Sequence, residues 1–233
     1  MPISYDPIRS PSRLGALAEL RTPLDAVLSA GRWLTLPRGP VAVPRTVLLV
    51  PGFGATERSM GLIGRHLARR GHRVHDWGLG RNNGDVPALL AALEARIEAL
   101  VDEAGEPVVA VGWSLGGYLA RESARDRPTR FRKVITLGSP VVGGPKYTVT
   151  ARWYRERGFD VDHIEQVVAA RYETPLEVPV VAIYSKRDRV VAWEACIDRW
   201  SPDVRHVEVS ATHVGLGISA RVVSVVADEV ASA

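Results

Sequence analysis

Residues 107–125 read PVVAVGWSLGGYLARESAR, and this stretch decides the fold. Pro107–Val111 is a short apolar run, which is typical of a parallel strand buried on both faces. Gly112–Gly117 then forms a tight, glycine-rich turn, and residues 118–125 continue as a helix. A G-x-S-x-G turn between a strand and a helix holds its serine on a strained bend at the N-terminal end of the helix dipole. We therefore predict Ser114 as a nucleophile, the alternative being a tight turn without a chemical role.

Apolar strands alternate with amphipathic helices on both sides of this turn. Strands are expected at residues 46–50, 72–77, 107–111, 133–137, 178–184 and 204–209, and helices at about 58–70, 87–101, 118–125, 161–171 and 220–230. This alternation predicts an α/β fold with a mainly parallel central sheet flanked by helices, because right-handed crossovers place helices on both faces. We expect this domain at residues 45–233, with a short cap insertion around 141–177.

Residues 1–44 are expected to form a helical N-terminal extension that packs on the body. Ser10-Pro11 and Thr22-Pro23 each combine an N-cap residue with a first-turn proline. Apolar side chains at positions 14, 17, 20, 24, 27 and 28 share one helical face, and Gly31 is expected just beyond the helix end. A peripheral membrane contact, or a cover over a pocket, is the alternative role for these helices.

Composition narrows the classes of protein. Of the 233 residues, 46% are hydrophobic and 24% charged, which indicates a soluble globular chain. The single cysteine, Cys196, excludes an internal disulfide framework. The net charge of +4 is spread along the chain without a basic stripe interleaved with aromatics, so no nucleic-acid partner is expected. The sequence shows neither a signal peptide nor an apolar run of about 18 residues, so we expect a cytoplasmic protein.

A serine hydroxyl is a weak nucleophile at neutral pH, so it needs a base that is itself oriented by an acid. In this architecture the serine comes first along the chain, then the acid, then the histidine. Two histidines lie late in the sequence, His206 and His213. His206 falls inside the last expected strand, whereas His213 falls in the loop beyond it, from which it can reach Ser114. We predict His213 as the base.

The orienting acid is expected directly after the preceding strand, at residues 178–184. Asp188 lies there, in the segment Ser185-Lys-Arg-Asp188. Its role would be to accept a hydrogen bond from Nδ1 of His213 and to stabilise the imidazolium. Asp198 and Asp203 compete for this role, but we expect Asp198 on a helix and Asp203 at a turn.

Acyl transfer also requires N–H donors for a developing oxyanion. One is expected from the backbone of Leu115, which follows the nucleophile, and the second from the loop after the first long strand. Gly52-Phe53-Gly54 occupies that place, and we predict the N–H of Phe53 as the second donor. The alternative is a glycine turn that only reverses the chain.

These segments together resemble the α/β-hydrolase superfamily, and in particular small bacterial lipase- or esterase-like serine hydrolases. The matching pieces are PGFG at 51–54, GWSLGG at 112–117, TLGSP at 136–140, SKRDRVV at 185–191 and THVGLG at 212–217. The resemblance covers about residues 45–232 and implies a Ser114–Asp188–His213 triad with no metal and no organic cofactor. Many members have a histidine where this chain has Pro51, and many begin with two more antiparallel strands.

The function expected from these residues is cleavage of carboxylic esters through an acyl-enzyme intermediate. The substrate would be a small-molecule acyl ester or a lipid. The residues expected to line its pocket are Trp113, Arg81, Asn82, Tyr147, Trp153 and Tyr154. A thioesterase, an amidase or an acyltransferase with the same triad is the enzymatic alternative. A ligand-binding protein on the same scaffold is the non-enzymatic one.

Overall fold

A computed structural model describes residues 8–12, 19, 22, 30–37 and 39–233 of the chain. Its centre is a six-stranded sheet in which all paired strands run parallel. The strands are β1 (Thr46–Val50), β2 (Arg73–Asp76), β3 (Val108–Trp113), β4 (Phe131–Leu137), β5 (Val180–Tyr184) and β6 (Val204–Glu208), in the spatial order β2-β1-β3-β4-β5-β6. The predicted α/β fold with a mainly parallel sheet is confirmed.

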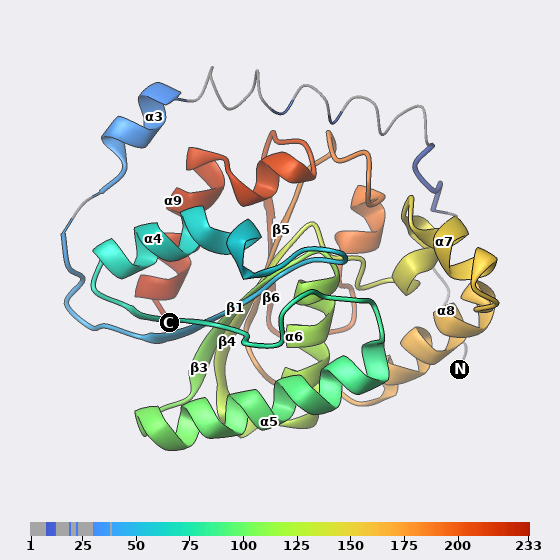
Figure 1. The fold of residues 1–233 in the computed structure, drawn as a ribbon, viewed down its shortest axis with the longest axis horizontal. Helices are drawn as coiled ribbons and strands as arrows, with labels where there is room; N and C mark the ends of the chain where they lie inside the picture. The colour runs from blue at the N-terminus through green and yellow to red at the C-terminus, as the bar shows by residue number, and fades with distance from the viewer. Residues whose placement is uncertain (1–7, 13–18, 20–21, 23–29, 38) are drawn as a thin grey trace.

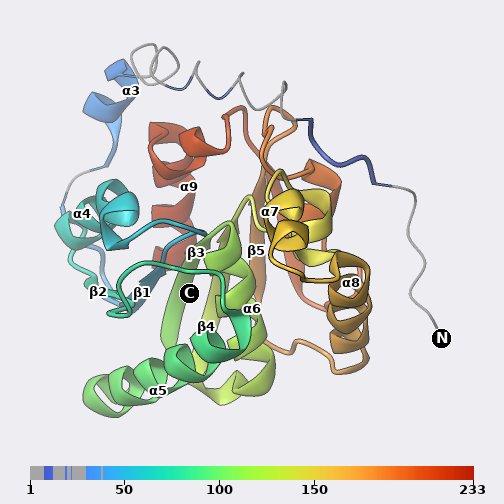
Figure 2. The ribbon, with the colours of Figure 1, turned by 45° about the vertical axis from the view of Figure 1, so that its right-hand side comes forward.

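Helices cover both faces of this sheet (Figure 1). The α-helices of the described residues are α3 (Ala30–Thr35), α4 (Gly61–Arg69), α5 (Val86–Ala104), α6 (Leu115–Asp126), α7 (Ala151–Glu156), α8 (Val161–Ala170) and α9 (Ala220–Ala231). Helices α4 and α9 pack on one face, and α5 and α6 on the other. Helices α7 and α8 lie together at one side of the sheet, as the turned view in Figure 2 shows.

The strand β1 is apolar after its first residue because each of its faces meets a different helical layer. Val47 and Leu49 join the cluster under α4 and α9, whereas Leu48 and Val50 join the cluster under α5 and α6. All four side chains are at most 2% exposed. Full burial of a valine or leucine side chain contributes about 1.5–3 kcal/mol, so both layers hold the strand in register.

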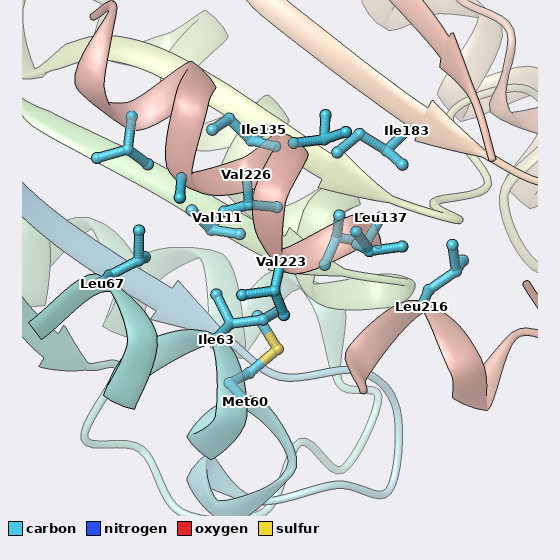
Figure 3. Packing of buried hydrophobic residues seen from close by; sticks show 14 of the residues in the cluster. Met60, Ile63, Leu67, Val111, Ile135, Leu137, Ile183, Leu216, Val223 and Val226 are labelled. Atoms are coloured by element: carbon cyan, nitrogen blue, oxygen red, sulfur yellow. The ribbon is translucent and has the colours of Figure 1, made fainter. Parts of the chain in front are cut away.

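The α4–α9 layer forms the core on one face of the sheet, part of which Figure 3 shows from close by. Ile63 of α4 and Val223 and Val226 of α9 interdigitate above the sheet. Val111 of β3 and Ile135 of β4 lie beneath them. This packing fixes the carboxyl ends of the central strands, which carry the candidate site.

Several local expectations are corrected by the structure. Helix α6 begins at Leu115, directly after the predicted nucleophile and earlier than the expected start at 118. Gly31 lies inside α3 rather than beyond a helix end, in a position where an added Cβ would meet no atom within 4 Å. Asp198 follows the 3-10 turn Trp193–Cys196 instead of lying on a helix. The short helix α7 was not expected.

The N-terminal extension is described only in parts. Its predicted apolar helical face, at positions 14 to 28, lies outside the described residues. Within α3 and the residue that follows it, Trp33 and Leu36 pack against the α4–α9 core, so this part of the extension contacts the body. None of the described helices is long and apolar enough to cross a membrane.

Candidate active site

Ser114 occupies the junction between β3 and α6 in a strained backbone conformation. Its φ of 55° is the sole positive value among the described non-glycine residues. Its N–H donates to the carbonyl of Leu137 over 2.8 Å, which ties the bend to the end of β4. Such a conformation costs of order 1–3 kcal/mol and persists where the surroundings fix it. The result is a serine presented at the carboxyl end of the sheet, next to the first N–H groups of α6.

The glycines of this turn are required by close backbone contacts. A Cβ on Gly116 would lie 2.3 Å from the carbonyl oxygen of Val50, and one on Gly112 would lie 2.4 Å from the Cα of Gly117. A Cβ on Gly52, in the neighbouring loop, would lie 3.2 Å from the Cβ of Ser114. The loop after β1, the end of β3 and the start of α6 therefore meet with no space for side chains.

The structure brings together the predicted acid and base. Oδ2 of Asp188 lies 2.6 Å from Nδ1 of His213, and both residues are buried. The other oxygen, Oδ1, accepts the backbone N–H groups of Val190 and Val191, each at 2.8 Å. With one oxygen fixed by the backbone, the other is held against the imidazole. Asp188 therefore favours the tautomer with the proton on Nδ1 and leaves Nε2 as a proton acceptor.

The electrostatics of His213 make it a stronger base than an isolated histidine. Burial lowers the pKa of the ring, but the charge of Asp188, its hydrogen bond and the charge of Glu19 together outweigh burial and raise the pKa above its ordinary 6.5. A base is most effective when its pKa lies near the working pH. His213 is thus a stronger proton acceptor than an isolated histidine.

The acid–base pair lies beside the serine turn. The rings of Trp113 and His213 have centroids 5.8 Å apart. A Cβ on Gly138, the residue after β4, would lie 3.0 Å from Oδ2 of Asp188 and 3.2 Å from Nδ1 of His213. Among the hydrogen bonds of the described residues, none joins Ser114 to His213. In enzymes without substrate this contact is often long and tightens on binding.

Two backbone N–H groups remain available near Ser114. Within the described residues, neither Phe53 nor Leu115 uses its N–H in a hydrogen bond. The loop that carries Phe53 is held by Asn82. The side-chain amide of Asn82 donates to the carbonyl of Pro51 at 2.9 Å, and the backbone carbonyl of Asn82 accepts the N–H of Gly54 at 2.7 Å. The structure thus places Asn82, which is fully buried, as a support of this loop.

Aromatic side chains of α7 lie over the same loop. The rings of Phe53 and Trp153 meet edge to face at 4.8 Å, and Tyr154 lies 6.2 Å from Phe53. Phe159, which is half exposed, packs on Tyr154 at 5.7 Å. The guanidinium of Arg157 covers Trp153 at 3.9 Å from the ring centroid. Trp153 and Tyr154 are therefore gathered next to the predicted oxyanion loop, with a cation at their edge.

The remaining residues expected at the pocket occupy different surroundings. Arg81 is exposed and donates to the carbonyl of Gly54 at 2.5 Å, so it lies on the oxyanion loop. Tyr147 donates to Oε1 of Glu165 at 2.6 Å and packs in a separate apolar cluster with Val191.

The competing acid and base are committed elsewhere. Nε2 of His206 accepts the N–H of Asp198 at 3.0 Å, and burial lowers the pKa of this histidine. The carboxylate of Asp198 is held in a buried ion pair with Arg121 at 2.5 Å. Their contacts explain both residues as parts of the scaffold.

Glu19 is a site neighbour that the sequence did not indicate. Its carboxylate accepts backbone N–H groups from Arg189, His213 and Val214, each at 3.1 Å. No motif surrounds Glu19 in the sequence, and the partners of its carboxylate are at least 170 positions away. Only the folded chain brings this carboxylate to the site.

Comparisons with known proteins agree with this architecture. The model of a family described as the alpha/beta hydrolase family matches residues 47–226. The pimeloyl-[acyl-carrier protein] methyl ester esterase of Edwardsiella ictaluri is 30% identical over 152 residues, which cover 64% of this chain and 55% of that protein. The match thus spans about half the length of this curated relative.

Solved structures extend the comparison at the level of the fold. A structure described with LipS and LipT, two metagenome-derived lipolytic enzymes, has a TM-score of 0.63 and 16% identity over 83% of this chain and 94% of that one. The monoacylglycerol lipase of Paleococcus ferrophilus has a TM-score of 0.60 and 16% identity over 82% and 96%. At this identity, these similarities speak for the fold alone.

Proposed function

The chain belongs to the alpha/beta hydrolase family, and from that premise we propose that it is a serine hydrolase that cleaves carboxylic esters. The observation that carries this proposal is the buried Asp188–His213 pair, joined at 2.6 Å, beside a serine at φ 55°. A strained backbone at a serine costs stability, and its known use in this kind of turn is to expose the hydroxyl for attack. The proposed nucleophile, acid and base are Ser114, Asp188 and His213.

In the first half of the proposed reaction, Oγ of Ser114 attacks the ester carbonyl carbon while Nε2 of His213 takes the hydroxyl proton. The carbonyl oxygen becomes an oxyanion, to which the N–H groups of Phe53 and Leu115 donate. His213 then gives its proton to the alcohol oxygen as the C–O bond breaks. The alcohol leaves, and an acyl-enzyme on Ser114 remains.

In the second half, water attacks the acyl-enzyme and gives its proton to His213. The bond to Oγ breaks, Ser114 regains the proton and the carboxylic acid is released. Asp188 accepts the Nδ1 hydrogen bond throughout and stabilises each imidazolium. Each oxyanion donor contributes roughly 2.7–4 kcal/mol of transition-state stabilisation in acyl-transfer enzymes.

The surroundings of the oxyanion loop support an acyl substrate with an apolar portion. Trp153, Tyr154 and the half-exposed Phe159 gather beside Phe53. Burial raises the pKa of Tyr154 to about 12, so its hydroxyl stays neutral. These rings are the proposed contacts of the acyl chain. An ester is preferred to a thioester or an amide because the curated relative described above is named as a methyl ester esterase.

Substrate series test the proposal. Purified full-length protein would be given p-nitrophenyl esters from acetyl to dodecanoyl, and matched thioesters and anilides. The protein with Ser114→Ala serves as the control. We expect ester turnover that depends on acyl length and is lost in the variant. Turnover of thioesters or anilides without esters would overturn the ester assignment. Tight binding without any turnover would favour a ligand-binding protein.

A further inference from the structure

Glu19 links the two loops that carry the candidate acid and base. Oε1 accepts the N–H of Arg189, the residue after Asp188, and also the N–H of His213 itself, both at 3.1 Å. Oε2 accepts the N–H of Val214 at 3.1 Å. One side chain of the N-terminal segment therefore spans the loops that must keep Asp188 and His213 at 2.6 Å.

A second contact anchors the same N-terminal segment to the loop that carries the candidate base His213, here called the base loop. The hydroxyl of Thr22 donates to the carbonyl of Glu19 at 2.6 Å and lies 2.6 Å from the hydroxyl of Thr212. Thr212 in turn accepts the N–H of Gly215 at 3.0 Å. Because Thr22 gives its single hydroxyl proton to Glu19, Thr212 is the donor to Thr22. These bonds form one chain from the base loop to the backbone of Glu19.

We propose that Glu19 is a positioning residue for the acid–base pair, and this proposal rests on the hydrolase function proposed above. Its carboxylate holds the backbone of His213 and the residue after Asp188 in fixed relative positions. Misplacing a reacting group by about 1 Å can cost about 100-fold in rate. A carboxylate that accepts three backbone hydrogen bonds next to the pair is well placed to prevent such a shift.

The loops also have an anchor that does not involve Glu19. The hydroxyl of Ser185 donates to the carbonyl of Ala211 at 2.6 Å and accepts the N–H groups of Arg187 at 3.1 Å and Ala211 at 3.2 Å. These hydrogen bonds join the two loops near their starts, beyond β5 and β6. We therefore expect the chain to fold when Glu19 is replaced, with the changes confined to the loop ends.

The negative charge of Glu19 also raises the pKa of His213. Among the described residues, two carboxylates bond to His213. Asp188 bonds to the Nδ1 atom of its ring, and Glu19 accepts its backbone N–H. The neighbours from β3 and the end of β4, Trp113 and Gly138, carry no charge. Arg189 is exposed on the acid loop. Both carboxylates raise the pKa of His213, so removing the charge of Glu19 should lower it.

The experiment compares Glu19→Gln and Glu19→Ala with the wild type in the full-length chain. Glu19→Gln removes the charge and keeps an acceptor oxygen, whereas Glu19→Ala removes both. Glu106→Gln is the matched control, because Glu106 accepts the N–H and hydroxyl of Thr46 at 3.1 and 2.8 Å at the opposite end of β1. The readouts are kcat and KM across pH, and the pKa of the His213 ring from an NMR titration.

We expect Glu19→Ala to lower kcat by at least about tenfold with little change in KM, because the pair is misplaced. Glu19→Gln should move the His213 pKa, and the acidic limb of kcat/KM with it, to lower pH. Glu106→Gln should change neither. Wild-type kcat, pH profile and His213 pKa in both Glu19 variants, with only a lower unfolding midpoint, would overturn the proposal.

The NMR titration keeps this test separate from the proposed function. If the wild type hydrolyses none of the esters, the ester assignment fails, but the His213 pKa is still measured. A downward shift in Glu19→Gln would then support the action of Glu19 on the base. If the wild type does hydrolyse esters, an unchanged His213 pKa, pH profile and kcat in both Glu19 variants would contradict the role of Glu19 and leave the proposed function standing.

Discussion

The serine turn and the loops of the acid and base position their side chains by different means: close backbone packing in the turn, and hydrogen bonds in the loops. Gly112–Gly117 fixes Ser114 through contacts between adjacent elements, β3, α6 and the loop after β1. The acid and base are fixed in part by a residue far away in the chain, since Glu19 bonds to partners 170 and 194 positions later. The turn is thus recognisable from its own glycine motif, whereas the acid–base geometry also depends on a distant segment that carries no motif.

This difference has an energetic consequence. The turn packs backbone on backbone, so an added side chain there displaces rigid atoms. The loops depend on hydrogen bonds to Glu19 that are part-buried at His213 and exposed at Arg189 and Val214, so each contributes no more than about 0.5–1.5 kcal/mol to stability. Changes in the turn should therefore act on folding and chemistry together, and changes in the loops should act mainly on the chemistry.

The largest effect is expected from Ser114→Ala. Removing the nucleophile should lower kcat by roughly 10⁴- to 10⁶-fold, because the remaining groups cannot form an acyl-enzyme. Stability should stay near the wild type, since alanine keeps the Cβ. Ser123→Ala is the control, because this buried hydroxyl on α6 has no hydrogen-bond partner among the described residues. A Ser114→Ala protein that retains wild-type turnover would refute the assignment of the nucleophile.

The next largest effect is expected from Asp188→Asn, and it distinguishes the roles of two buried aspartates, Asp188 and Asp198. Asp188→Asn should lower kcat by roughly 10⁴-fold while the protein stays folded, because an amide favours the wrong tautomer of His213. Asp198→Asn should leave kcat of the folded protein unchanged but lower the free energy of unfolding by up to about 3–5 kcal/mol, because Arg121 loses one of its two buried carboxylate partners and keeps only Glu122. Kinetics and urea unfolding on both variants check this. Reversed outcomes would transfer the acid role to Asp198.

A third test compares two glycines. Gly116→Ala should lower the free energy of unfolding by about 2–4 kcal/mol, because its Cβ would meet the carbonyl oxygens of Val50 and Pro51 at 2.3 and 2.5 Å. Gly31→Ala, on α3, should raise it by about 0.5–1 kcal/mol, because alanine loses less backbone freedom than glycine in a helix. Apart from the helix backbone, no atom of the described residues lies within 4 Å of the added Cβ. Denaturant midpoints distinguish the two. Equal stability of both variants would show that the turn is loosely packed.

The smallest expected effect is a displaced pH profile. The reaction needs neutral His213, whose pKa is raised, so kcat/KM should fall as the pH drops through a value above 6.5. His206→Gln is the control, because glutamine can still accept the N–H of Asp198 and the variant should keep the same profile. An acidic limb at or below pH 6.5 would contradict the electrostatic account of the base.

The sequence was most informative where structure is local. The strand 46–50 and the start of the last helix at 220 agree with β1 and α9, because apolar periodicity sets them directly. The order of serine, acid and histidine singled out Asp188 and His213, which the structure brings together. Their catalytic roles, and that of Ser114, stay predictions.

The sequence could not show contacts between segments that only the folded chain brings together. Asn82 was expected to line a pocket, but its amide reaches back 31 positions to the carbonyl of Pro51. Glu19 lies in no motif, and its proposed positioning role depends on three N–H groups from two distant loops. Such side chains look ordinary in the sequence, because their role is set by tertiary approach rather than by their neighbours.

The most direct test of the account is to find which residue a fluorophosphonate probe labels. Full-length wild type, Ser114→Ala and His213→Ala would be incubated with the probe, digested and read by mass spectrometry, with circular dichroism to show that each is folded. The account predicts one adduct on the peptide that contains Ser114, absent from Ser114→Ala and formed much more slowly in His213→Ala. A folded wild type that carries no adduct, or carries it on another residue, would contradict an activated Ser114.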